Sequence, residues 1–185
     1  MPALRFDPTA SVEFDLDRGQ IALRDGAERL LVPADALVAL YESAAPEAKK
    51  DFARRLGTET GRRAAERLGD AASAGVDAVV EHVGGDWALL GLGSLSLERW
   101  GKALVFVVSG SPLGGAGDAL LGAILEGVLQ RAFGREAGAV RLVRDGTQVR
   151  FLITSRAGAH RVHGWIESGT PWGEALTRLN SGVGS

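Results

Sequence analysis

Apolar positions recur along this chain with two different spacings, and the change of spacing separates predicted strands from predicted helices. Within residues 11–32, apolar residues at every second position alternate with charged ones, which indicates short strands separated by turns. A spacing near 3.6 residues follows, and it predicts helices over 33–43, 46–68 and 75–83. A proline at the start of each of the first two helices suits the first helical turn. This part of the chain is therefore expected to hold a small β element and three helices.

The spacing returns to two in the second half of the chain. The elements expected there are strands at 87–92, 94–100 and 103–109, a strongly apolar helix at 118–133, a hairpin at 140–154, and short helices at 157–167 and 172–179. Tight turns at Gly101 and at Asp145-Gly146 impose antiparallel pairing on the strands they join. The sequence therefore predicts an α+β fold, with an antiparallel sheet of four or five strands, helices mainly on one face, and a small N-terminal β element.

The length of 185 residues suits one domain with a core of its own. No internal repeat and no linker long enough to separate two domains is visible in the sequence. We therefore expect a single domain over 1–185, made of the N-terminal β element (1–32), a core (33–155), and C-terminal helices with a tail (156–185).

Composition and charge exclude several classes of protein. Hydrophobic residues make up 45% and charged residues 24%, which is ordinary for a globular domain, and the formal net charge of −2 gives no strong field to attract nucleic acid. The absence of cysteine excludes disulfides, thiolate catalysis and zinc–thiolate sites. The charged N-terminal segment leads us to expect no signal peptide, and apolar runs such as 103–108 are too short to cross a bilayer. We expect a cytoplasmic protein without membrane insertion or nucleic-acid binding.

The candidate packing or interface residues are small side chains on one helix and one tryptophan at a turn. Gly57, Gly61, Ala64 and Leu68 share one face of the predicted helix over 46–68. Each interior glycine costs a helix about 1 kcal/mol relative to alanine, so two of them indicate that the backbone lies close to a neighbouring element or subunit. Trp100, at the turn between two predicted strands, is a candidate anchor for an interface.

The only grouping with metal-ligating chemistry lies near the C-terminus. His160, His163 and Glu167 fall at i, i+3 and i+7 of a predicted helix and so share one face, where they could hold a divalent ion. Two histidines on one turn are common on solvated helix faces, so we expect no metal and no cofactor. No nucleophile–base pattern, paired-carboxylate motif or dinucleotide fingerprint occurs in the chain, and we expect no enzymatic activity.

Two further polar residues have plain structural interpretations. His82 is expected at the end of its helix, where a histidine interacts favourably with the helix dipole. Asp118 follows a glycine-rich loop and begins the apolar helix, so it is expected to cap that helix rather than to help bind phosphate.

Several of these segments resemble one known family. The glycines of the helix over 46–68, the Leu90-Gly91-Leu92-Gly93 segment before the 95–108 hairpin, the helix start at 117–122 and the Asp145-Gly146 hairpin resemble the 4-vinyl reductase (hydrocarbon-binding) domain family. They are also similar to its relatives among the TRAPP transport-complex subunits. The resemblance covers roughly residues 34–155, and it rests on glycine and apolar positions of low specificity.

The resemblance implies a helix-covered antiparallel sheet, a dimer, and a role in binding or scaffolding. Members of the first branch often carry metal-binding cysteines near the last hairpin, and TRAPP relatives can hold an acyl chain on a buried cysteine; this chain has neither. Haem-binding relatives use a Tyr-Ser-Arg type clamp, whereas Tyr41 is followed by Glu42-Ser43-Ala44. The resemblance therefore implies only the scaffold of the family for this chain, and none of the family's specific activities.

The leading hypothesis is a non-enzymatic cytoplasmic binding or scaffold module that self-associates as a homodimer and binds a protein partner or a small apolar ligand. The alternative is a small-molecule sensor or enzyme with a pocket between the helix over 118–133 and the sheet. A third interpretation, regulation of a small GTPase, rests only on the analogy with TRAPP assemblies.

Overall fold

The computed structural model describes residues 11–24, 26–69, 75–134 and 136–181. In chain order its elements are β1 (Val12–Asp15), β2 (Gln20–Leu23), β3 (Glu28–Arg29), α1 (Ala34–Ser43), α2 (Pro46–Leu68), α3 (Val76–Leu89), β4 (Ser94–Trp100), β5 (Ala103–Ser109), the 3-10 turn η1 (Gly115–Gly117), α4 (Asp118–Phe133), β6 (Ala137–Asp145), β7 (Gln148–Ser155), α5 (Arg156–Glu167) and α6 (Trp172–Ser181). The predicted α+β class is confirmed. None of the described helices is long and apolar enough to cross a membrane.

The main sheet has four strands in the order β4-β5-β7-β6, and every neighbouring pair is antiparallel. The hairpins β4–β5 and β6–β7 meet where β5 pairs with β7, with Phe106 opposite Phe151. The register shifts between Arg141 and Val143, so β6 carries an irregularity at the outer edge of the sheet. The two central strands are the most apolar ones, because helices cover both of their faces.

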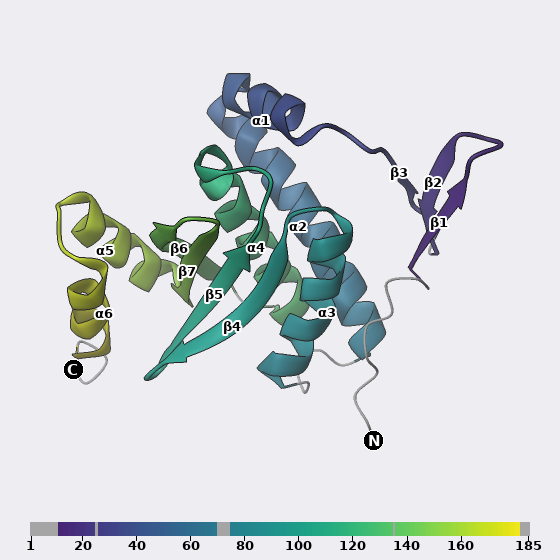
Figure 1. Cartoon of the computed structure of the whole chain (residues 1–185). Helices are drawn as coiled ribbons and strands as arrows, with labels where there is room; N and C mark the ends of the chain where they lie inside the picture. Colours follow the sequence, from purple (N-terminus) through teal and green to yellow (C-terminus); the bar gives the residue numbers. More distant parts are fainter. Residues whose placement is uncertain (1–10, 25, 70–74, 135, 182–185) are drawn as a thin grey trace.

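Alternate residues of the central strands serve two separate cores. Phe106, Val108 and Phe151 pack with α2, α3 and α4 on one face. Val105 and Leu152 point to the other face, where the shorter α5 and α6 cover them. Figure 1 shows this arrangement, with α2 and α4 behind the sheet and α5–α6 to the left of it. Most of the helical mass lies on one face, as predicted, and the C-terminal pair closes the other.

The glycines of α2 lie against α4 of the same chain. A Cβ atom on Gly57 would collide with the carbonyl oxygen of Ile124 and lie 3.0 Å from the Cα of Gly127. A Cβ on Gly61 would lie 2.7 Å from the carbonyl oxygen of Val128. The two helices therefore approach backbone to backbone. Ala64 is fully buried and the partly buried Leu68 packs against the same core, so this face makes a contact within the chain.

Helix α3 continues beyond its predicted end at Val83, through Gly84-Gly85, to Leu89. The strand predicted over 87–92 is therefore wrong. Trp87 is fully buried on the stripe that begins with Val79 and Val83, and its indole N–H donates to the carbonyl oxygen of Leu92 at 3.1 Å. Burial of this stripe outweighs the low helix propensity of the two glycines.

The three N-terminal strands form a second, smaller antiparallel sheet in the order β1-β2-β3. Its cross-strand pairs include Val12 with Leu23 and Phe14 with Ile21. In Figure 1 this sheet stands off from the helices and is joined to α1 by an extended segment. Of its side chains only that of Leu23 is buried, so the N-terminal sheet has almost no core of its own.

Candidate functional site: a hollow between the central helix and the sheet edge

A hollow of about 610 Å³ lies between the N-terminal half of α4, the edge strand β6 and helix α5. On α4 it is lined by Ala119, Gly122 and Ala123, which fall at i, i+3 and i+4 and share one face. The opposite face of α4 carries the large leucine and isoleucine side chains that fill the core. The hollow exists because one helix places bulky residues inward and small residues toward the sheet edge.

The floor of the hollow is the ring of Phe151, which is 1% exposed. A Cβ on Gly122 would lie 3.2 Å from this ring and 3.5 Å from the carbonyl oxygen of Ala139, so the glycine lets α4 close down onto β6 and β7. The far wall is Ala159 of α5, whose methyl group faces Gly138 of β6. Small residues on three elements therefore leave space above an aromatic floor.

The rim of the hollow is polar. The carboxylate of Glu126 accepts a hydrogen bond from the backbone N–H of Ala139 at 3.0 Å, which satisfies one free donor of the edge strand. Arg141, His160 and His163 complete the rim, and all three are exposed. A pocket with an apolar floor and a few polar groups at its mouth is the usual form of a small-molecule site.

Asp118 anchors one end of the hollow. It is 3% exposed, and its carboxylate accepts hydrogen bonds from the guanidinium groups of Arg144, with Nε at 3.0 Å, and Arg141, at 3.3 Å. The same guanidinium of Arg144 also donates to the carbonyl oxygen of Gly114 at 3.1 Å. The bond to Asp118 raises the pKa of Arg144 above its ordinary value, so this cation stays charged. The cluster fixes the η1–α4 turn to β6.

The predicted cap is thus wrong in detail. Asp118 is the first residue of α4, the cap position is held by Gly117, and no side chain there caps the helix. The carboxylate turns toward β6 because two arginines reach it from a strand that lies more than twenty residues away in sequence.

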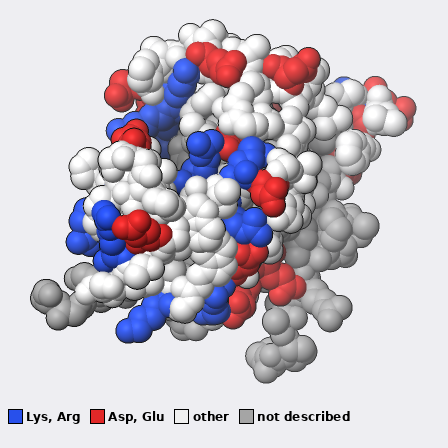
Figure 2. Space-filling model, turned by 60° about the vertical axis from the view of Figure 1, so that its left-hand side comes forward, with Lys and Arg blue, Asp and Glu red and all other residues white. Residues whose placement is uncertain are grey.

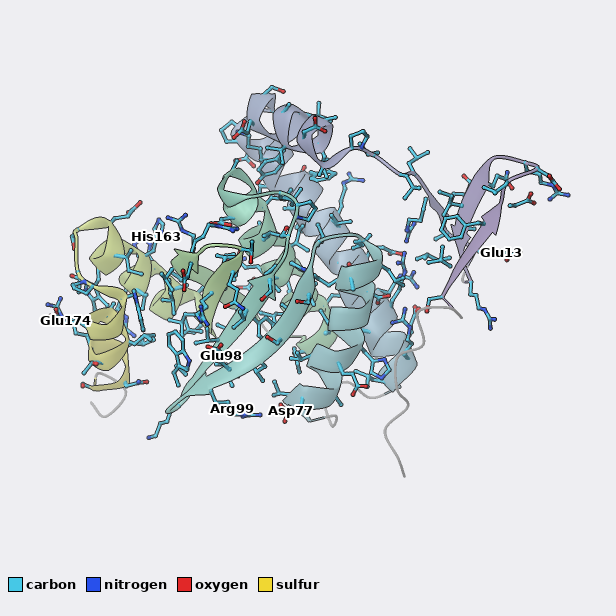
Figure 3. The ribbon with its side chains drawn as sticks, viewed as in Figure 1. Glu13, Asp77, Glu98, Arg99, His163 and Glu174 are labelled. Carbon is cyan, nitrogen blue, oxygen red and sulfur yellow. The ribbon has the colours of Figure 1, made fainter. Side chains whose placement is uncertain are left out.

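The three residues considered for a metal do not form a ligand set. The Nε2 atom of His163 lies 3.1 Å from a carboxylate oxygen of Glu167, and both histidines lie at the rim of the hollow, which Glu167 does not line. The described residues include no group of three or more His, Asp or Glu side chains that could hold a metal ion. Figure 3 shows His163 at the surface of α5.

A second hollow, of about 370 Å³, lies between β2 and the helices α2 and α3. It is strongly ionic. The guanidinium of Arg67 donates to both carboxylate oxygens of Asp86, at 2.7 and 3.0 Å, and Arg63 donates to Glu59 at 2.8 Å. The Asp86 side chain is 1% exposed. These side chains already satisfy one another, so this hollow suits an apolar ligand less well than the first.

His82 and Trp100 have different surroundings from those expected. Because α3 is longer than predicted, His82 lies within the helix and is 6% exposed, and its Nδ1 atom has no hydrogen-bond partner among the described residues. The Trp100 ring packs on Trp172 of α6, with ring centroids 5.0 Å apart, and its indole N–H donates to Glu98 at 3.0 Å. Trp100 is half-buried inside the chain and is not a free anchor.

Charges of both signs are spread over the outside of the protein. Figure 2, which brings the α5–α6 side forward, shows Lys and Arg interspersed with Asp and Glu, with no extended area of one sign among the described side chains of this face. In Figure 3 the side chains of Asp77 and Arg99 lie together, and their ion pair is 3.1 Å long between exposed partners. This surface gives no support to nucleic-acid binding.

No protein-family model matches the chain, and no curated protein sequence matches it. Among solved structures, the fold is similar to the crystal structure of the phenol-responsive sensory domain of the transcription activator PoxR with phenol. The TM-score is 0.56, the alignment covers 92% of each chain, and 18% of the residues are identical. The chain therefore shares the overall fold of that domain. At this identity the likeness establishes the fold alone.

Proposed function

We propose that this protein is a non-enzymatic module that binds a small, largely apolar molecule in the hollow between α4, β6 and α5. The observation that carries the proposal is the hollow itself, with its buried aromatic floor, walls of alanine and glycine, and a polar rim. Its volume of about 610 Å³ falls within the range of small-molecule sites, about 300–1,000 Å³. The alternative hypothesis from the sequence is a small-molecule sensor or enzyme with a pocket between the central helix and the sheet, and the hollow beside α4 and β6 supports the sensor form of that alternative.

The lining favours a particular ligand chemistry. The ring of Phe151 can pack against an aromatic or alicyclic ring, and the small side chains around it add apolar surface without filling the space. At the rim, the imidazoles of His160 and His163 can each donate and accept hydrogen bonds, and Arg141 can donate. The ligand class that fits is a small ring compound with one hydroxyl or carbonyl group directed to the rim.

The fold supports the same proposal. The structurally similar PoxR domain responds to phenol, which is a small aromatic molecule with one hydroxyl group. A common fold does not transfer a ligand, because sites vary freely on one scaffold. It does make ligand sensing the function class to test first, and it favours placing the chain with the hydrocarbon-binding relatives of the 4-vinyl reductase domain. A cytoplasmic location without a bound cofactor belongs to the same proposal.

The test is a calorimetric titration of the purified protein with phenol, and with cyclohexanol as the non-aromatic comparison. In Ala119→Trp an indole placed on the exposed wall of the hollow occupies the space, so binding should weaken at least tenfold. The matched control is Ala88→Trp, because Ala88 is also an exposed helical alanine and lines neither hollow. Equal binding by both variants and the unchanged protein would refute the site, and absence of saturable binding to either probe would refute the ligand class.

A further inference from the structure

A β-bulge in the edge strand β6 places two arginines on the face of the sheet that α4 covers. Side chains alternate along a regular strand, so Arg141 and Arg144, three residues apart, would normally point to opposite faces. The register shift that follows Arg141 changes this alternation, and Arg141 lies opposite Phe151 while Arg144 lies one pair beyond, opposite Val149. Phe151 and Val149 both belong to the core beneath α4. Since residues opposite each other share a face, both arginines lie on the α4 side of the sheet.

One of these arginines is sufficient to pair with the buried carboxylate of Asp118. Arg144 donates to it through Nε, at 3.0 Å, and through Nη2, and it also donates to the carbonyl oxygens of Gly114 and Gly146. Arg141 adds a single bond of 3.3 Å to Asp118, the only hydrogen bond of its side chain among the described residues, and it is 59% exposed. Two guanidinium groups and one carboxylate leave one positive charge unmatched, and Arg141 places it at the rim of the hollow.

Arg141 is also the cross-strand neighbour of the aromatic floor. It lies directly opposite Phe151, and such pairs have Cβ atoms about 4.5–5.5 Å apart. A ring that packs on Phe151 would therefore hold its substituent within reach of the guanidinium of Arg141. A guanidinium has five N–H donors, and two of them can bind the two oxygens of one carboxylate in parallel. The geometry thus joins an apolar surface for a ring to a cation for an acid group.

We propose that the ligand of the hollow is an aromatic carboxylate, whose ring packs on Phe151 and whose acid group binds to Arg141. The inference rests on the proposed function, and it narrows the polar group of the ligand to an anion. His160 and His163, at the same rim, can donate further hydrogen bonds to the carboxylate. Arg141 is then the residue that determines specificity, because a neutral ring compound of equal size leaves its charge unmatched.

The second acidic residue of the lining, Glu126, lies where it opposes an anion least. It follows Asp118 by eight residues in α4, which is about 12 Å along the helix axis. Its carboxylate already accepts the hydrogen bond from the backbone N–H of Ala139. The Debye length at physiological ionic strength is about 8 Å, so most of the repulsion over this distance is screened. The hollow therefore has a positive end where α4 begins and a negative end two turns later, and the acid group belongs at the first.

The test is a calorimetric titration of the full chain with benzoate and with benzyl alcohol, which share the ring and differ in the charge of the substituent. The unchanged protein should bind benzoate at least about tenfold more tightly, because a charge-assisted pair with arginine is stronger than a neutral hydrogen bond. Raising the salt from about 0.01 M to about 1 M should lower this preference at least about threefold, because Arg141 is half-exposed and salt screens exposed pairs.

The variant Arg141→Gln removes the charge and keeps a polar side chain. The ratio of the two affinities should fall to near one, mainly through weaker binding of benzoate. Asp118 keeps its bonds to Arg144, so the variant should retain its circular dichroism spectrum and melting profile. The matched control is Arg161→Gln, which removes a charge from an exposed position of α5 that does not line the hollow, and it should keep the preference for benzoate.

The possible failures are distinguishable. If both probes bind saturably and equally tightly, the anion is refuted and the proposed function stands. A preference for benzoate that Arg141→Gln retains would also overturn the inference, because another group would then bind the acid. If neither probe binds saturably, the hollow is not a site for ring compounds, and the proposed function fails together with this inference.

Discussion

The contact between α2 and α4 offers the sharpest test of the fold, through the substitution Gly57→Ala. On a solvated helix this change would be stabilising, because alanine has a higher helix propensity than glycine by about 1 kcal/mol. Here the new methyl group would collide with the carbonyl oxygen of Ile124 and lie 3.0 Å from the Cα of Gly127. Both neighbours are backbone atoms, which cannot rotate aside as the end of a flexible side chain can. The two helices must therefore separate.

The magnitude follows from comparing the two effects. Adding a methyl group to a tightly packed core costs about 1–3 kcal/mol, and the rigid neighbours place this site at or beyond the upper end. After the gain in helix propensity is subtracted, the free energy of unfolding should fall by about 2 kcal/mol or more. For a chain of this size, that loss corresponds to a melting temperature about 4–8 °C lower.

The assay is thermal and urea unfolding followed by circular dichroism at 222 nm. The matched control is Gly164→Ala, because Gly164 also lies inside a helix, α5, and no described atom beyond its own stretch of helix backbone lies within 4 Å of its would-be Cβ. The control should gain up to about 1 kcal/mol. Opposite signs for the two glycine-to-alanine changes are the expected result. A Gly57→Ala protein as stable as the unchanged one, or more stable, would refute the close backbone contact.

Two further predictions concern the helical layer. The chain has one tyrosine, Tyr41, and burial raises its pKa above the ordinary value of 10.0, so its absorbance at 295 nm should titrate above pH 10 in the folded protein. Because the folded state holds the phenolic proton more tightly than the unfolded state, the free energy of unfolding should fall as the pH rises past 10. A titration midpoint at or below pH 10 would contradict this prediction. Asp86→Ala removes the buried partner of Arg67 and should lower the free energy of unfolding by about 2–3 kcal/mol. This is less than the roughly 3–5 kcal/mol lost when a fully buried pair is broken, because the Arg67 side chain is 32% exposed. A urea midpoint equal to that of the unchanged protein would show that the pair is not stabilising.

The elements that the sequence predicts well are those fixed by local chemistry. The Asp145-Gly146 turn and the alternating residues on either side of it specify the β6–β7 hairpin without reference to the rest of the chain. The glycines of α2 indicate that another backbone packs closely against this helix, because only a tertiary contact explains why the helix keeps residues of such low helix propensity. What they cannot say is which element that neighbour is, and the structure places α4 of the same chain there.

The errors have the opposite origin. Gly84-Gly85 predict the end of α3, but burial of Trp87 continues the helix past them, and that burial depends on elements far away in sequence. The sequence around Asp118 predicts a local role as a helix cap, whereas its partners, Arg141 and Arg144, come from a strand that only the folded chain brings near. Short-range rules fail where a long-range contact competes with them.

The hollow could be predicted only in part. Its location between the central helix and the sheet follows from the order of elements, but its residues do not. Ala119, Gly122 and Ala123 fall on one face of α4, and that run of small side chains was the available signal. To interpret these small side chains as the wall of a hollow, one must know that this face of α4 meets the edge strand β6 and not the core, and only the tertiary fold gives that information.

The measurement that tests the central proposal most directly is a chemical-shift titration of the ¹⁵N-labelled protein with phenol. The account predicts saturable shifts of the backbone amides of Gly122, Ala139 and Ala159, which line the hollow. The amides of Glu66 and Leu89, at the second hollow, should not move. Saturable shifts at the second hollow with none at the first, or no saturable shift at either, would contradict the account.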